Sequence, residues 1–225
     1  MSDLYVQPVL PSDLALVHED EDLLVLHKPA GLLCVPGLGP DKQDCLSRRV
    51  QARWPQALIV HRLDMVTSGL VLMALGPERQ RQLSHLFERR QVDKRYEAVV
   101  HGRPQGGHPD GDHGEITLPI RIDWLNRPLS IVDPVRGRPS HTRWRWLGEG
   151  PWAGTHRLEL EPLTGRTHQL RLHLAAIGHP IVGDTLYAPH AMPPRSPRVL
   201  LHARELRFVH PGTGQPCHFV APVPF

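Results

Sequence analysis

Cysteine is scarce in this sequence, and long hydrophobic runs are missing from it. The three cysteines, Cys34, Cys45 and Cys217, are too few and odd in number for a disulfide framework, and they lack the spacing of a zinc site. The longest apolar runs, such as residues 69–75, fall far below the roughly 20 residues that a membrane-spanning helix needs. These absences argue against a disulfide scaffold and against a membrane protein.

The amino terminus also lacks the basic segment and apolar segment that together mark a secretory signal, so we expect a cytoplasmic protein. Hydrophobic residues make up 40% of the chain and charged residues 22%, as in ordinary folded domains. A length of 225 residues is enough for one substantial core. We expect a single domain over residues 1–225, with its core from about residue 14 to residue 222, and a monomer.

The overall charge is nearly balanced, at a formal +3. Two local groups of basic residues stand out, namely Arg89, Arg90, Lys94 and Arg95, and later Arg136, Arg138, Arg143 and Arg145. Such groups are compatible with a nucleic-acid surface. Taken alone, however, they favour a basic face in contact with solvent.

Hydrophobic patterns predict many short strands and few helices. The expected strands are residues 14–17 and 23–27, which form a hairpin, then 70–75, 96–100, 115–122, 141–147 and 156–163, and a closing hairpin of 206–210 and 216–220. The expected helices are residues 77–90 and 167–177, the second ending at Gly178. Residues 103–114 and 189–198 are expected to be loops. Because strands and helices do not alternate regularly, we expect an α+β fold with a mixed, mostly antiparallel sheet.

Residues 61–69, HRLDMVTSG, are the most informative stretch of the chain. They follow the apolar run 58–60 and place Asp64 in a turn-forming segment. Asp64 is either an active-site carboxylate or an aspartate that caps the turn through backbone amides. Two later segments accompany it: residues 94–102, KRYEAVVHG, and residues 164–173, TGRTHQLRLH, which are followed by GHPIVGD at 178–184 and by Tyr187.

These three segments, in this order, resemble the signatures of the RluA-type RNA pseudouridine synthases, and the resemblance extends over roughly residues 20–220. It implies a pseudouridine synthase catalytic domain with a central RNA-binding cleft, in the short form that lacks an N-terminal RNA-binding domain. It also implies an enzyme that isomerises specific uridines in ribosomal RNA, transfer RNA or both, without a cofactor. RNA is then the expected partner.

The resemblance assigns three catalytic candidates. Asp64 is the essential carboxylate, acting either as a nucleophile toward the sugar or as a base that removes a sugar proton. Tyr96 is expected to stack on the displaced uracil and to bring its hydroxyl near the sugar. Arg166 is expected to pair with Asp64 and to favour its charged form. A tyrosine packed in a strand core and a surface arginine beside a helix are the alternative interpretations.

Four further residues are expected to bind the substrate. Arg62 either displaces the target nucleotide from the RNA stack or contacts a phosphate. His61 is expected to make a supporting hydrogen bond rather than to transfer a proton. Lys28 is expected either to contact an RNA phosphate or to be a solvated lysine. Leu170 completes the set.

No metal is expected. His168 and His173 are five residues apart, a spacing that does not put both on one helix face as in zinc-binding helices. We expect Asp184 to cap the turn before Tyr187 rather than to act as a second acid.

Two other functions are considered. A non-catalytic RNA-binding or RNA-folding factor on the same scaffold is disfavoured by the joint presence of Asp64, Tyr96 and Arg166. A hydrolase with His61, Asp64 and Ser68 as its triad is disfavoured because Ser68 lacks a G-x-S-x-G elbow, and because three triad members within one turn do not converge readily.

Overall fold

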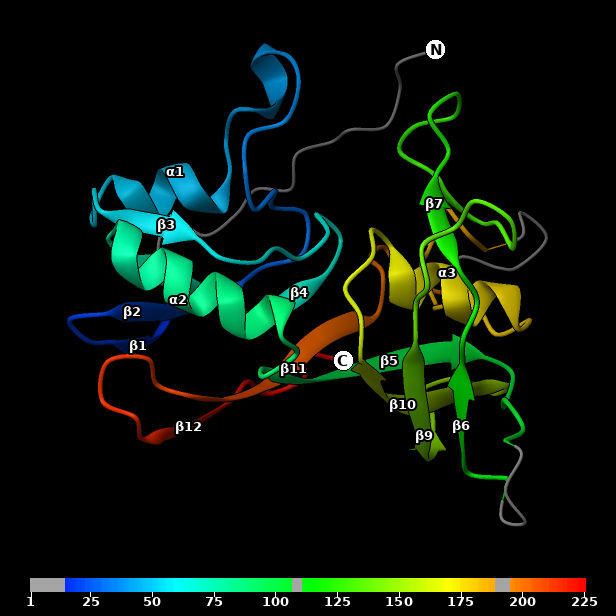
Figure 1. The fold of residues 1–225 in the computed structure, drawn as a ribbon. Coiled ribbons are helices and arrows are strands. Elements are labelled where there is room, and N and C mark those ends of the chain that lie inside the picture. Colours follow the sequence, from blue (N-terminus) through cyan, green and yellow to red (C-terminus); the bar gives the residue numbers. More distant parts are fainter. Residues whose placement is uncertain (1–14, 107–110, 189–194) are drawn as a thin grey trace. The chain divides into compact units, whose positions relative to one another are not determined.

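A computed structural model describes residues 15–106, 111–188 and 195–225 of the chain (Figure 1). The chain divides into two compact units, Met1–Val92 with Glu205–Pro222, and Asp93–Arg204 with Val223–Phe225. Strand β11 (Leu201–Val209) begins in the second unit and ends in the first. The sequence predicts a single domain, and the division into two units does not decide whether that prediction holds.

The first unit is a set of antiparallel strands with two α-helices. Its elements are β1 (Ala15–Glu19), β2 (Leu23–Lys28), the 3-10 helix η1 (Pro40–Lys42), α1 (Leu46–Gln51), β3 (Ala57–Ile59), β4 (Ser68–Leu75), α2 (Pro77–Glu88), the end of β11, and β12 (Pro216–Val220). Strand β4 pairs with both β2 and β3, and β12 pairs with β11. The two expected hairpins, β1–β2 and β11–β12, are confirmed.

Strand β4 carries the core of the first unit. Seven of its eight residues are buried, so the strand is apolar on both faces and does not alternate. It packs with residues of β2, α2 and β11, among them Leu23, Leu83 and Phe208. The register of β2 against β4 places Lys28 opposite Gly69, and therefore brings the end of β2 to the segment that precedes β4.

Helix α2 starts where predicted and ends two residues earlier, at Glu88. Pro77 occupies its first turn, where a missing backbone N–H costs nothing. At its end the amide of Gln91 donates to the carbonyl of Leu86, and that of Arg90 donates to Phe87. Arg90 adopts a left-handed backbone conformation, with φ 59°. This is the Schellman termination, with arginine in the position that glycine usually takes.

The second unit is an antiparallel sheet with one helix and a small separate hairpin (Figure 1). Its elements are β5 (Asp93–His101), β6 (His113–Ile116), β7 (Ile120–Ile122), β8 (Ser130–Val132), β9 (Thr142–Glu149), β10 (Thr155–Pro162), α3 (Gln169–Ala176) and the start of β11. The strand order is β5-β10-β9-β6, while β7 pairs with β8 alone. Helix α3 packs against β8, β9 and β10.

The fold class expected from the sequence is confirmed. The paired strands run antiparallel, and a parallel bridge joins Leu33 to Cys45. One strand prediction was wrong, because residues 115–122 form the end of β6 and the whole of β7 instead of one strand. Pro119 lies in the break and has no N–H to give to a ladder. The sequence also missed α1, β3 and β8, which are too short to show a period.

Helix α3 begins at Gln169, two residues after its expected start, and its end at Gly178 is confirmed. The loop expected at residues 103–114 is partly strand, since β6 begins at His113, and residues 107–110 lie outside the described part. The same holds for residues 189–194 of the proline-rich loop and for Leu14. Among the residues that the structure describes, no helix combines the length and hydrophobicity that crossing a membrane requires.

Candidate active site

Asp64 lies in the segment between β3 and β4, which we call the Asp64 turn (residues 61–67). The amide of Thr67 donates to the Asp64 carbonyl oxygen at 3.1 Å, and this bond closes the turn. Thr67 is buried, whereas Asp64 is half-buried. This closing bond is made by the backbone of Asp64.

Lys28 supports the Asp64 turn from the interior. Its side chain is fully buried, and its ammonium donates to the carbonyl oxygens of Pro29 at 2.8 Å, Leu32 at 2.8 Å and Met65 at 3.1 Å. The Met65 carbonyl also accepts a bond from the amide of Gly31 at 2.8 Å. An ammonium has three N–H donors, and these three carbonyls match them. The solvated lysine considered from the sequence is therefore wrong, and the burial disfavours the phosphate contact.

Cys34 holds the other side of the turn. The amide of Leu63 donates to its Sγ at 3.2 Å, and both residues are buried. Burial raises the pKa of the Cys34 thiol, although the nearby Lys28 charge opposes that effect. A neutral thiol is thus the acceptor. The residues before and after Asp64 are both held by buried partners, which the sequence did not predict.

His61 opens the turn and is fixed by backbone and ring contacts. Its Nε2 accepts a bond from the amide of Leu72 in β4 at 2.9 Å, so the neutral ring carries its proton on Nδ1. The ring stacks on Phe87 of α2, with 4.4 Å between centroids. His61 therefore makes a hydrogen bond within the fold, while its expected part in substrate binding stays a prediction. Arg62, the next residue, is exposed.

Tyr96 lies in β5 of the second unit and is half-buried. It pairs with Leu160 of β10, so the pleat places it on the face of the sheet to which Leu160 belongs. Its neighbour Arg95 belongs to the opposite face. Leu160 is fully buried, and β10 contacts α3.

Arg166 lies in the loop that leads into α3. Its guanidinium donates to the carbonyl oxygen of Pro139 through two nitrogens, at 3.2 and 3.1 Å, and its amide donates to the side-chain oxygen of Gln169 at 3.0 Å. Gln169 is buried, and its amide group donates to His141 O and Thr142 Oγ1, both at 3.0 Å. Gln169 therefore ties the Arg166 loop to β9, a role that its place in the motif did not reveal.

An ion pair anchors the segment that follows α3. Arg171 donates from two nitrogens to both carboxylate oxygens of Asp184, at 2.7 and 2.9 Å, and the two side chains are 5% and 0% exposed. Asp184 also accepts bonds from the amides of Leu186 and Tyr187, which confirms that it caps this turn. Leu170, beside Arg171 in α3, is only 7% exposed.

Tyr187 connects α3 to the β7–β8 hairpin. Its hydroxyl accepts a bond from the amide of Ser130 at 2.9 Å and lies 2.8 Å from Nδ1 of His168. His168 begins α3 in a left-handed backbone conformation, with φ 57°, which is uncommon for a residue other than glycine. The start of the helix after Arg166 is thus held by tertiary contacts instead of a side-chain cap.

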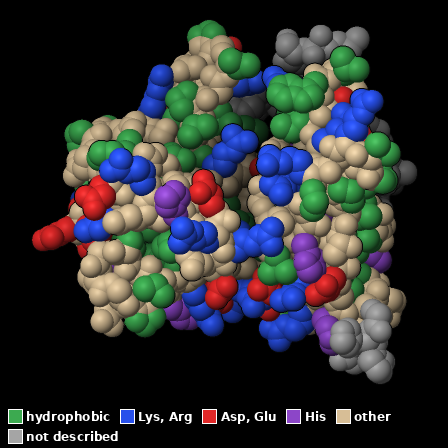
Figure 2. All heavy atoms as spheres, viewed as in Figure 1, with side chains coloured by type: hydrophobic (Ala, Val, Ile, Leu, Met, Phe, Trp, Pro, Cys, Tyr) green, Lys and Arg blue, Asp and Glu red, His purple; other side chains and the backbone are tan. Residues whose placement is uncertain are grey.

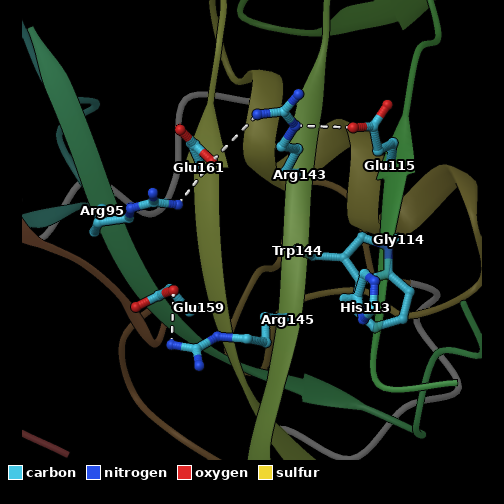
Figure 3. Close-up of a pocket in the computed structure, with 9 residues that line it drawn as sticks. All are labelled: Arg95, His113, Gly114, Glu115, Arg143, Trp144, Arg145, Glu159 and Glu161. Atoms are coloured by element: carbon cyan, nitrogen blue, oxygen red, sulfur yellow. Dashed lines mark hydrogen bonds and ion pairs between the residues drawn. The ribbon is translucent and has the colours of Figure 1, made fainter. Parts of the chain in front are cut away.

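Three arginines from the two basic groups predicted from the sequence, Arg95, Arg143 and Arg145, are neutralised by glutamates. A shallow pocket of about 620 Å³ lies over β5, β6, β9 and β10, and its charged lining, which we call the charged face, comprises Arg95, Glu115, Arg143, Arg145, Glu159 and Glu161 (Figure 3). Arg143 pairs with Glu115 at 2.8 Å, Arg95 with Glu161 at 2.7 Å, and Arg145 with Glu159 at 3.0 Å. Figure 2 shows acidic side chains beside basic ones over these strands.

Three arginines and three glutamates cancel on the charged face, so it offers no net attraction to phosphates. The interpretation of these arginines as a solvated face is thus favoured over a nucleic-acid surface. In the described part of the chain, no three His, Cys, Asp or Glu side chains gather in a way that could hold a metal ion. His173 is fully buried and bonded to Thr142 and Ser140.

The predicted catalytic residues fall in both units. Asp64, His61, Arg62 and Lys28 belong to the first unit, and Tyr96, Arg166 and Leu170 belong to the second. Within the first unit, Lys28 and Asp64 are brought to one turn, as described above. The meeting of Asp64 with Tyr96 and Arg166 stays a prediction, as does the central cleft.

Residues 22–176 match the family model of RNA pseudouridylate synthase. The chain is 43% identical over 221 residues to the dual-specificity RNA pseudouridine synthase RluA of Pasteurella multocida (strain Pm70), with 98% of each chain covered. It is 41% identical over 212 residues to the protein of the same name from Escherichia coli (strain K12), with 94% of each covered.

Two solved structures are also similar. Human RNA Pseudouridylate Synthase Domain Containing 1 aligns with a TM-score of 0.77 at 31% identity, over 95% of this chain and 85% of that one. Human RNA Pseudouridylate Synthase Domain Containing 4 aligns with a TM-score of 0.73 at 24% identity, over 93% and 88%, and supports the fold alone.

Proposed function

Because the chain belongs to the RNA pseudouridylate synthase family, we propose that it converts specific uridines of structured RNA to pseudouridine, with Asp64 as the essential carboxylate. The reaction breaks the bond between nitrogen 1 of uracil and the sugar, turns the base while it stays bound, and joins carbon 5 to the same sugar carbon. Carbon 5 loses a proton and nitrogen 1 gains one, so no redox partner is needed. A carboxylate that acts on the sugar and walls that hold the free base suffice.

The support for Asp64 at the Asp64 turn carries this proposal. Leu63 and Met65 flank Asp64 and bond to the buried Cys34 and Lys28. A carboxylate whose neighbours are fixed on both sides loses little freedom when it meets the sugar, and such positioning lowers the barrier. Its half-buried position suits a group that must meet a nucleotide and yet be shielded from bulk water.

The other predicted residues receive roles on the same basis. We assign Tyr96 to the wall that holds the freed uracil, and Arg166 to the stabilisation of the Asp64 carboxylate. Arg62 is exposed, which suits a side chain that displaces the target nucleotide from the RNA stack. Leu170 and His61 are assigned to the boundary of the nucleotide site. Lys28 is assigned to support of the turn, because it is buried.

We also propose the class of RNA and the setting. The similar bacterial enzymes are named dual-specificity RNA pseudouridine synthases, and the sequence motifs are those of a family that acts on transfer and ribosomal RNA. We therefore propose stem-loops of both RNA classes as substrates, with the chain acting as a cytoplasmic monomer. Maps of pseudouridine in total RNA from cells with and without the protein identify the modified sites.

The decisive test compares Asp64→Asn with the matched control Asp41→Asn, which removes an exposed carboxylate from the same unit. Tritium release is measured from RNA labelled at carbon 5 of uridine and taken from cells that lack this protein. Wild type and the control release tritium, whereas Asp64→Asn releases none and keeps its RNA affinity within about tenfold. Turnover by Asp64→Asn would remove Asp64 from its role, and binding without release by wild type would favour the non-catalytic RNA factor.

A further inference from the structure

The β7–β8 hairpin carries an exposed apolar end. We call residues 120–138 the arm and residues 123–129 its tip. Trp124 is 65% exposed and Leu125 is 94% exposed. Of the five tryptophans, all within the described residues, Trp124 alone is exposed. Figure 2 shows hydrophobic and basic side chains together at this end of the hairpin. An exposed indole beside an exposed leucine is a typical mark of a contact surface.

The tip is held by its own hydrogen bonds. The amide of Asp123 donates to Leu129 O at 2.9 Å, and the amide of Leu129 donates to Asn126 O at 3.0 Å. The Asp123 carboxylate accepts bonds from the amide of Leu125 at 3.2 Å and from the side chain of Asn126 at 2.9 Å. The exposure of Trp124 and Leu125 therefore comes from a structured turn.

The base of the arm is fixed as well. Arg121 and Asp133 form an ion pair, and Asp133 also accepts bonds from the amides of Val135 and Arg136 at 3.0 and 2.9 Å. The amide of Ser130 donates to the hydroxyl of Tyr187. Because Tyr187 follows the turn that Asp184 caps and Arg171 anchors, the arm is joined to the segment around α3. Residues at the tip thus have a defined position within the second unit.

The charge of the arm favours a polyanion. It contains four arginines, Arg121, Arg127, Arg136 and Arg138, and two aspartates, Asp123 and Asp133, so its formal charge is 4 − 2 = +2. Both aspartates are engaged in the bonds that shape the arm. The guanidinium of Arg127 lies 3.6 Å from the centroid of the Trp124 ring. On the charged face, by contrast, each arginine has a glutamate partner.

We propose that the tip of the arm binds an unpaired nucleobase of the RNA other than the target uridine. Trp124 and Leu125 receive the base, and Arg127 contacts the phosphate beside it. Proteins bind single-stranded nucleic acid with aromatic rings and guanidinium groups, because every base can stack on a ring and every phosphate carries a negative charge. This inference rests on the proposed function, since it assumes that the partner is RNA.

The test measures dissociation constants of the full chain for two probes, a transfer-RNA stem-loop transcript and a blunt duplex with the same stem. Trp124→Ala is expected to weaken stem-loop binding about tenfold and duplex binding little. Trp124→Phe retains a stacking ring and is expected to recover most of the affinity. Arg127→Gln is expected to weaken binding and to lower the salt slope by about one. Leu147→Ala, an exposed apolar residue of β9, is the control and binds as wild type.

Two results overturn the inference. One is stem-loop affinity for Trp124→Ala equal to that of wild type. The other is a change of oligomeric state on Trp124→Ala with unchanged RNA affinity, which would identify the tip as a contact with a second copy of the chain. Tritium release by wild type is followed in parallel. If wild type releases tritium and Trp124→Ala binds the stem-loop as tightly as wild type, the inference alone fails. If wild type releases no tritium, the proposed function fails, while the comparison of dissociation constants still tests whether the arm binds RNA.

Discussion

Cationic side chains play opposite parts in the interior and on the charged face. Lys28 and Arg171 are buried, and each is matched to oxygen acceptors by several hydrogen bonds. Arg143 and Arg145 are 52% and 62% exposed and pair with glutamates across neighbouring strands. A buried polar group that loses its partner cannot turn to water, whereas an exposed one can. Burial, more than charge, therefore decides which of these residues the fold depends on.

The largest effect is expected for Arg171→Met. This change leaves the Asp184 carboxylate buried without its partner, and such losses cost about 3–5 kcal/mol of the free energy of unfolding. Arg171→Met combined with Asp184→Asn removes the orphaned charge and is expected to recover a large part of that loss. Urea denaturation measures both, with Arg145→Met on the charged face as the control. Equal stability of Arg171→Met and wild type would contradict the comparison.

Lys28→Met is expected to lower the free energy of unfolding by about 3 kcal/mol, because the carbonyls of Pro29, Leu32 and Met65 lose their donor. The matched control Lys42→Met alters an exposed lysine of the same unit and stays within about 0.5 kcal/mol of wild type. Since Lys28 holds the Asp64 turn, the turnover number of the variant is expected to fall more than its RNA affinity. If Lys28 instead acted at the surface, the RNA affinity of the variant would fall more than its turnover number.

The third prediction concerns pH. Burial lowers the pKa of His173 below its ordinary value of 6.5, although a bond to the Leu118 carbonyl opposes this. On unfolding, the imidazole regains its ordinary pKa. Below pH 6.5 it therefore binds a proton in the unfolded state, while in the folded state it stays neutral to a lower pH. The unfolded state is then favoured, so the free energy of unfolding falls as the pH drops through about 6.5.

His173→Gln is expected to remove this component. The variant is less stable than wild type at pH 7.5, because it loses part of the bonding to Thr142 and Ser140, but the difference narrows at pH 5. Urea denaturation at the two pH values measures the change. A difference that stays constant between them would show that His173 does not contribute to the acid sensitivity.

The smallest effect is expected for Arg143→Gln. Its ion pairs are exposed, and the charged face carries no net charge, so RNA affinity is expected to change less than about twofold. Arg127→Gln in the arm removes the same kind of charge from a region with a positive surplus, and its effect is expected to be larger. Filter binding at two salt concentrations compares the pair. A larger loss for Arg143→Gln would reverse the assignment of the two surfaces.

Much of the fold could be read from local patterns. The alternation in β10, the run of apolar residues in β4 and the glycine after α3 each act through neighbours in the chain, so these elements were predicted nearly to their ends. The break between β6 and β7 was missed because it depends on which strands pair: β6 joins β9, while β7 joins β8. Pro119 was a visible signal for that break.

The candidate site was predictable in part. The motif around Asp64 predicts the essential carboxylate, and that role stays a prediction, whereas Asp184 was correctly assigned as a turn cap. The burial of Lys28 was not predicted, because the sequence around a lysine that follows an apolar strand does not show whether its side chain faces solvent or the interior. Its burial follows from the pairing of β2 with β4, which places it opposite Gly69. Cys34 was missed for the same reason, since its partner Leu63 is distant in the chain.

The sequence by itself determined the hairpins, the main helices, the family and the residue types available for chemistry, because these depend on short spacings and on motifs. The tertiary structure alone decided which cations are buried, which arginines are neutralised by glutamates of another strand, and that Trp124 is exposed at the end of a fixed arm. These outcomes depend on strand register and long-range contacts. Strand register and long-range contacts decide how far each charge is buried from water. They therefore determine whether a cation supports the fold or is available to a partner.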